Sequence, residues 1–191
     1  MDKTSKKIID AMMEIILEKG YTGATTKDIA ERAGVNECTI FRKFKEKKEI
    51  VVAGMDLPQY RPNITPETFS DIKWDIEIDL KMFMENYMKE VSPEFVRLSI
   101  GLRSPQIYQQ TAPLIMNIPQ TFLRALTDYL AEMKKRNKIR NIDCDTIAAT
   151  ILSATFGYTF LSASFGRDLL DLERSEYIEK TVKSIIGGIA L

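Results

Sequence analysis

Residues 33–44 read AGVNECTIFRKF, and this short stretch decides the fold. Gly34 interrupts the chain, and Asn36 can cap a helix that follows it. The helix would run over residues 36–44 and would carry three large apolar side chains and two adjacent cations. These are Ile40, Phe41, Phe44, Arg42 and Lys43. We expect the apolar groups to bury against preceding helices, which leaves Cys38 and Thr39 outside, each four residues before a cation.

The flanking sequence predicts three more helices. Residues 4–19 place apolar side chains at i, i+4, i+7 and i+8 from Ile8, and Gly20 can end that helix in the left-handed conformation. A second helix would start with a capping box, formed by a threonine and an aspartate at the two ends of Thr25–Asp28. A fourth helix is expected over residues 47–55.

Positive charge gathers at the short third helix. Residues 36–48 contain five cations and two acids, in a chain whose 27 Lys and Arg residues balance 27 Asp and Glu residues. A helix of this kind fits the major groove of DNA, and the helix–glycine–helix order predicts a helix-turn-helix. Two other interpretations stay open: an ordinary solvated face, or a head that docks another protein. Steep salt dependence of binding to random DNA would favour the DNA-binding interpretation.

Residues 25–47, TTKDIAERAGVNECTIFRKFKEK, resemble the N-terminal signature of the tetracycline-repressor (TetR) family of bacterial transcription regulators. The match extends over about residues 5–55. The resemblance implies base contacts from the start of the third helix and phosphate contacts from the second and fourth. The implied DNA-binding set is Thr26, Lys27, Asn36, Glu37, Cys38, Thr39, Phe41, Arg42, Lys43 and Lys47. The family often has Lys, Gly and Tyr at positions 37, 38 and 41, so the operator sequence cannot be taken from a relative.

The remaining sequence predicts an all-α fold in two domains. Prolines cluster over residues 57–66 and mark a joint between a DNA-binding domain at 1–56 and a ligand-binding and dimerisation domain at 57–191. No alternating apolar-polar run indicates a strand. The expected helices beyond the joint are 65–91, 92–103, 112–138, 143–165 and 174–190.

Large apolar side chains in the second domain suggest a cavity for a small, largely apolar effector, as the family resemblance implies. The candidate ligand-binding residues are Trp74, Ile78, Met82, Phe83, Tyr87, Phe95, Met116, Phe122 and Phe156. For any one of them, ordinary core packing is the competing interpretation. An acidic stripe at Asp71, Asp75 and Asp79 is interpreted as a solvated face.

Small residues along 145–158, together with the last helix, predict half of a four-helix dimer interface. Its candidate residues are Thr150, Ala154, Tyr158, Leu161, Val182, Ile185 and Ile186. The alternative is that both helices only close the core of the monomer.

The amino-acid composition argues against several other classes of function. The sequence has no histidine and only two distant cysteines, which argues against a disulfide framework, a metal site and most acid–base catalysis. We therefore expect neither an enzyme nor a cofactor. No run of about 18 uninterrupted apolar residues predicts a membrane span, and the cytoplasm is the expected location. The sequence thus predicts a homodimeric repressor, released from a palindromic operator of double-stranded DNA by a small molecule.

Overall fold

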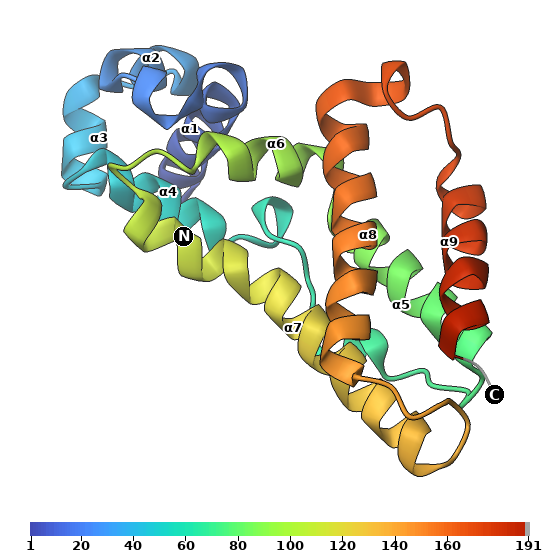
Figure 1. Cartoon of the computed structure of the whole chain (residues 1–191). Coiled ribbons are helices and arrows are strands. Elements are labelled where there is room, and N and C mark those ends of the chain that lie inside the picture. Colours follow the sequence, from blue (N-terminus) through green and yellow to red (C-terminus); the bar gives the residue numbers. More distant parts are fainter. Residues whose placement is uncertain (190–191) are drawn as a thin grey trace. The chain divides into compact units, whose positions relative to one another are not determined.

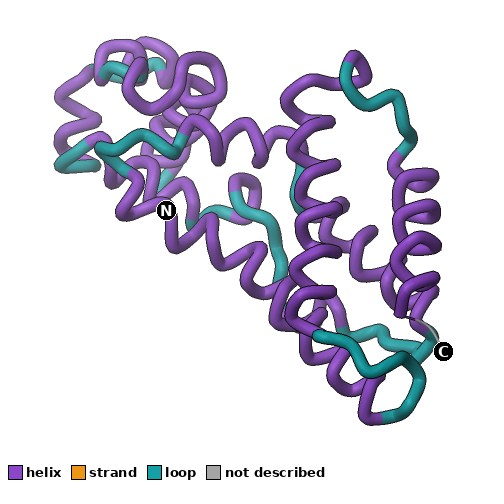
Figure 2. Tube along the Cα trace, viewed as in Figure 1, coloured by secondary structure: helices purple, strands orange, loops and turns teal. Residues whose placement is uncertain are grey.

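The computed structural model describes residues 1–189, and over these residues it is helical throughout, with loops between helices and no strand (Figure 2). The all-α prediction is confirmed. Contacts divide the chain into two compact units. Unit 1 comprises Met1–Pro62 and Glu94–Met116, and unit 2 comprises Asn63–Pro93 and the chain from Asn117 onward. The predicted boundary at residue 56 therefore lies near the end of the first segment of unit 1, which also gains a later segment of chain.

Unit 1 is built on its first helix. In chain order its helices are α1 (Lys3–Gly23), α2 (Thr26–Ala33), α3 (Glu37–Lys43), α4 (Lys47–Met55), the 3-10 helix η1 (Pro58–Tyr60), α6 (Pro93–Gly101) and the start of α7 (Tyr108–Lys135) (Figure 1). α1 packs against both α2 and α4. Its apolar face is fully buried, with Ile8, Met12 and Ile16 at most 2% exposed. Gly20 has a positive φ of 72°, but with a ψ of 170° it is not in the predicted left-handed helical conformation, and it kinks α1, which continues to Gly23, instead of ending it.

A close approach holds α6 against α1. A Cβ atom added at Gly101, the last residue of α6, would lie 2.8 Å from Cγ2 of Ile16 and 3.0 Å from its carbonyl oxygen. Only a residue without a side chain fits at this crossing, because the neighbour includes backbone that cannot move aside. The C-terminal end of α6 is thereby fixed within unit 1.

Unit 2 is a helical bundle around an aromatic core. Its helices are the 3-10 helix η2 (Pro66–Phe69), α5 (Ile76–Glu90), the remainder of α7, α8 (Cys144–Phe165), the 3-10 helix η3 (Gly166–Asp168) and α9 (Arg174–Ile189). α5 packs against α8 and α9. Phe69, Phe83, Tyr87 and Phe122 contact one another with ring centroids 4.9 to 6.2 Å apart. The last predicted helix ends at Ile189 in the structure, and Ala190 lies outside the described residues.

One predicted helix is wrong. Residues 65–91 do not form a single helix, because η2 ends at Phe69 and α5 starts only at Ile76. Asp75 caps α5, accepting from the amides of Glu77 and Ile78 at 3.0 Å. Trp74 before it has a φ of 60°, which takes it out of any right-handed helix.

The interpretation of the acidic stripe is also wrong at one position. Asp79 is fully buried, and its carboxylate accepts from the amides of Lys73 at 2.8 Å and Asp75 at 3.1 Å and from the Tyr129 hydroxyl at 2.9 Å. A buried carboxylate needs such donors to replace water. These bonds hold residues 73–75 across the start of α5, so they explain why the helix begins late.

Candidate nucleic-acid interface

Local capping fixes the two short helices, as the sequence predicts. The amide of Asp28 donates to the Thr25 hydroxyl, and the amide of Thr25 donates to the Asp28 carboxylate, both at 3.1 Å. Gly34 ends α2 in the left-handed conformation, with φ 65° and ψ 41°. The Asn36 side chain accepts from the Cys38 amide at 2.9 Å and so starts α3. These bonds set the turn between the helices of a helix-turn-helix.

Ion pairs hold α2 on α1, and each joins one helix to the other. The Arg32 guanidinium donates to both carboxylate oxygens of Glu18, at 2.6 and 2.8 Å. Lys19 pairs with the capping carboxylate of Asp28 at 2.8 Å. Both bonds hold the pKa of the receiving carboxyl below its usual range. No spacing rule in the sequence points to these pairs, because they depend on how the helices cross.

α3 has one buried and one exposed face, but Phe41 lies on the opposite face from the one predicted. Ile40 is 2% exposed, whereas Phe41 is 57% exposed. Phe44 is half-buried and terminates the helix. In a helix of seven residues the angular spacing of 100° between neighbours does not allow positions 40 and 41 both to face the same narrow contact. Phe41 therefore belongs to the outward surface with Cys38 and Arg42, which are also exposed.

Only some of the cationic side chains near α3 are available to bind DNA. Over residues 1–189, the side chains of Lys27, Arg42 and Lys45 have no ion-pair partner and are exposed. Lys43 instead pairs with the Asp2 carboxylate at 3.0 Å, and this contact, after the bonds from Ser5, helps to lower the pKa of Asp2. The positive charge that α3 presents is thus smaller than the sequence count suggests.

Lys47 and Thr26 are engaged inside unit 1. The Lys47 ammonium donates to the carbonyls of Tyr21 at 3.0 Å and Ala24 at 2.8 Å and lies 4.2 Å from the centroid of the Tyr21 ring. Burial lowers its pKa. The Thr26 hydroxyl donates to the Glu37 carboxylate at 3.1 Å, which joins the first turn of α2 to the first turn of α3. In this arrangement both side chains stabilise the head, and a contact to phosphate by either would require these bonds to be exchanged.

The nine predicted ligand-binding residues differ in burial and in the unit to which they belong. Phe83, Tyr87 and Phe122 are at most 1% exposed and fill the core of unit 2. Ile78 and Phe156 are exposed by 54% and 38%. Trp74 stacks on Tyr129, Met82 is half-buried, and Phe95 and Met116 belong to unit 1. For the three aromatic core residues, ordinary packing is the interpretation that the structure favours.

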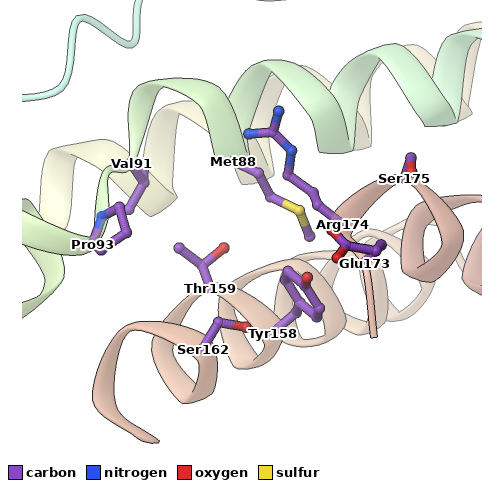
Figure 3. Close-up of a pocket in the computed structure, with 9 residues that line it drawn as sticks. All are labelled: Met88, Val91, Pro93, Tyr158, Thr159, Ser162, Glu173, Arg174 and Ser175. Atoms are coloured by element: carbon purple, nitrogen blue, oxygen red, sulfur yellow. The ribbon is translucent and has the colours of Figure 1, made fainter. Parts of the chain in front are cut away.

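Two hollows lie wholly within unit 2, and none of the nine predicted ligand residues lines either. The first has a volume of about 450 Å³ and lies between α5, α8 and the start of α9 (Figure 3). Its lining residues are Met88, Val91, Pro93, Tyr158, Thr159, Ser162, Glu173, Arg174 and Ser175. The second, of about 400 Å³, lies between α8 and α9 and includes Thr150, Ala154 and Ile185 in its lining.

α8 exposes much apolar surface. It is the one helix within residues 1–189 that is long and apolar enough to cross a membrane by length and composition, with a mean hydropathy of 1.3. Only 28% of that apolar window is buried. Thr150 is exposed, and five of the other predicted interface residues are partly exposed; these are Ala154, Tyr158, Leu161, Ile185 and Ile186. Val182 is the exception: it is fully buried in the subunit and cannot contact a partner.

Comparison with known proteins agrees with the geometry of the head. Residues 8–53 match the family model described as bacterial regulatory proteins of the tetR family. An HTH-type transcriptional regulator of Bacillus subtilis, YvkB, whose function is uncharacterised, is 30% identical over 190 residues, which is all of this chain and 99% of the relative. IcaR of Staphylococcus aureus, described as a negative regulator of a biofilm operon, is 23% identical over 161 residues, 81% of this chain and 86% of IcaR.

Solved structures share the fold. NalD of Pseudomonas aeruginosa, described as the secondary repressor of a multidrug efflux pump, superimposes with a TM-score of 0.71 at 18% identity, over 98% of this chain and 96% of NalD. PfmR of Thermus thermophilus gives a TM-score of 0.67 at 18% identity, over 94% and 97% of the two chains. The fold and the head thus define a helix-turn-helix transcriptional regulator that binds DNA, not an enzyme. The chain belongs to the TetR family of bacterial transcription regulators.

Proposed function

We propose that the protein is a homodimeric repressor whose α3 reads a near-palindromic operator and which a small-molecule effector releases from DNA. The observation that carries the proposal is the outward face of α3, where Phe41 is 57% exposed and Arg42 has no ion-pair partner among residues 1–189. An exposed aromatic side chain beside an unpaired guanidinium has no structural use within the subunit. On DNA, an Arg can bind guanine bidentately and an aromatic ring can pack on a thymine methyl group.

The other residues of the predicted DNA-binding set fall into two groups: side chains that are free to contact DNA, and side chains that are already bonded within the head. Cys38 and Lys27 are exposed and free to contact bases and phosphate, respectively. Asn36 caps α3 and Thr39 lies in its first turn, and we expect this end of the helix to lie nearest to the bases. Glu37 is held by Thr26, so its carboxylate has a fixed place from which to accept a cytosine amino group. Lys47 contributes by holding the head rigid, since its ammonium is engaged with backbone carbonyls.

A second copy of the chain is the partner best suited to the surface of α8 and α9. The hollow of about 400 Å³ between these helices is lined by Thr150, Ala154 and Ile185, all from the predicted interface. An apolar helix with most of its surface uncovered calls for an isologous partner. A symmetric dimer would present two α3 helices, and we expect their half-sites about 34–36 Å apart along the DNA.

The direction of regulation is proposed from relatives. IcaR is described as a negative regulator and NalD as a repressor, and repression is accordingly proposed for this chain. Regulation of transcription also requires access to the bacterial chromosome, so we propose a cytoplasmic location. An effector would act by its differential affinity for the DNA-bound and free states.

Selection of bound sequences from a random DNA pool, followed by fluorescence anisotropy, tests the proposal. We expect a near-palindrome, and Arg42→Ala should weaken binding to it by about 1–3 kcal/mol. Arg140→Ala is the matched control, because Arg140 is an exposed guanidinium of unit 2 outside the candidate interface. Equal affinities of the wild type and the Arg42 variant would rule out this face as the DNA-reading surface.

A further inference from the structure

The hollow between α5, α8 and the start of α9 has the features of a binding site for a charged small molecule. We propose that it binds an amphipathic monoanion, a carboxylate with an apolar chain, and that Arg174 binds the carboxylate. The inference rests on the proposed function in one respect: it assigns the effector that would act on DNA binding. The hollow lies wholly within unit 2, and none of the predicted ligand residues belongs to it.

One wall of the hollow is apolar. Met88, Val91 and Pro93 come from the end of α5 and the start of α6, and they face α8 and the start of α9 across the hollow (Figure 3). Met88 and Val91 are 6% and 3% exposed, so they are well fixed in place. The volume of about 450 Å³ lies within the usual range for small-molecule sites. A methionine thioether next to aliphatic groups suits a flexible apolar chain.

Two charged residues line the hollow, Glu173 and Arg174, and only Arg174 is free of an ion pair among the described residues. The Glu173 carboxylate is paired with Arg167. An Arg side chain can only donate hydrogen bonds, and its planar group matches a carboxylate with two parallel bonds. An anion is therefore the ligand that this pair of neighbouring residues favours.

Two of the hydroxyl groups that line the hollow already donate hydrogen bonds within the protein. The Tyr158 hydroxyl already donates to the Leu172 carbonyl at 2.8 Å, and the Thr159 hydroxyl donates to the Thr155 carbonyl at 2.8 Å. Neither proton is available to a ligand unless those bonds are exchanged. The hydroxyls of Ser162 and Ser175 also line the hollow and can hydrogen-bond a ligand, but the guanidinium is its one cationic group within the described residues. We therefore expect a ligand with one anionic group and an otherwise largely apolar body.

The position of the site in the chain gives it a route to regulation. Val91 and Pro93 are among the last residues of unit 2 before the chain passes into unit 1 at Glu94. α6 begins at Pro93 and ends at Gly101, which is locked against Ile16 of α1. A ligand that contacts Val91 and Pro93 would bias the segment that connects the two units.

Calorimetric titration of the full chain with decanoate, and separately with 1-decanol, tests the inference. We expect wild-type protein to bind decanoate more tightly than the alcohol. Arg174→Gln should weaken decanoate binding about tenfold and leave 1-decanol within about twofold, because only the anion uses the guanidinium. Arg140→Gln removes a comparable exposed cation of unit 2 outside the hollow and should change neither affinity.

A second variant tests the location of the site. Ser162→Trp places a large ring in the hollow and should abolish binding of both compounds, with the helical circular dichroism signal retained. Failure of decanoate to bind wild type, equal loss for acid and alcohol in Arg174→Gln, or unchanged binding in Ser162→Trp would each overturn the inference. The proposed function fails by a different result, namely absence of specific DNA binding by the ligand-free protein. Specific DNA binding that decanoate does not weaken, despite its binding in the hollow, would overturn the assignment of this site to the effector.

Discussion

The buried carboxylate of Asp79 allows the effect of one substitution on the free energy of unfolding to be predicted in detail. Removing it by Asp79→Ala leaves the Tyr129 hydroxyl, which belongs to a residue that is 3% exposed, with only a long contact of 3.5 Å to the Asp75 carbonyl, at a cost of about 1–3 kcal/mol. The amides of Lys73 and Asp75 belong to exposed residues and can hydrogen-bond to water once the carboxylate is gone. The loss of stability from each amide should therefore be smaller than for a fully buried donor. Part of this loss is offset because a buried charge no longer has to be desolvated. We expect the free energy of unfolding to fall by about 2–4 kcal/mol.

The assay is urea unfolding at fixed protein concentration, because the proposed dimer would gain stability as the concentration rises. Trp74, the single tryptophan, reports on this same cluster, since its ring lies 6.2 Å from that of Tyr129 and 3.6 Å from the Arg136 guanidinium. Its fluorescence and the far-ultraviolet circular dichroism should shift together. The slope m should stay unchanged if only stability is affected.

A double-mutant cycle separates the hydrogen bond from general packing. Tyr129→Phe alone should cost about 1 kcal/mol, because the Asp79 carboxylate keeps its two amide donors. In the Asp79→Ala background the same change should cost little, since the Tyr129 hydroxyl then keeps only its long contact to the Asp75 carbonyl. The coupling should therefore exceed about 0.5 kcal/mol. An Asp79→Ala variant as stable as the wild type, or strictly additive effects, would refute the reasoning.

Three further predictions follow from particular contacts. Gly101→Ala should lower the free energy of unfolding by about 1–3 kcal/mol, because the new methyl group would clash with Ile16. Gly157→Ala, where a Cβ atom would have no other atom within 4 Å, should raise it by up to about 1 kcal/mol. Urea midpoints measure both changes, and a shift of both midpoints in the same direction would contradict the packing argument. Trp74→Gly should be more stable than Trp74→Ala by about 1 kcal/mol in the same assay, because both lose the ring contacts but only glycine accepts a φ of 60° freely. Burial, with a hydrogen bond to a carboxylate, raises the pKa of Tyr60 to about 12, so the folded state holds this proton where the unfolded chain releases it. Stability should fall as the pH rises from 10 towards 12, and Tyr60→Phe should lessen that fall in thermal unfolding; an unchanged slope would count against the shift.

Local chemistry explains the features that could be predicted from the sequence. The capping box of Thr25–Asp28, the left-handed Gly34 and the Asn36 cap all depend on atoms within four residues of each other. Such contacts form in the same way wherever the helices lie. The helix-turn-helix and the family were therefore legible in residues 25–47, and the all-α architecture followed from helical periodicity.

Tertiary structure alone decided which side chains are available. Lys47 and Asp79 look like surface residues by type, yet one is held by carbonyls of α1 and of the residue after it, and the other is buried beneath Tyr129. Phe41 looks like a core residue by type, yet it is exposed. The sequence by itself determined where the two helices of the helix-turn-helix start, through their caps, and it predicted that the head binds DNA. Burial, the ion pairs between helices and the hollow near Arg174 depend on residues of different helices, which come together only when the helices pack.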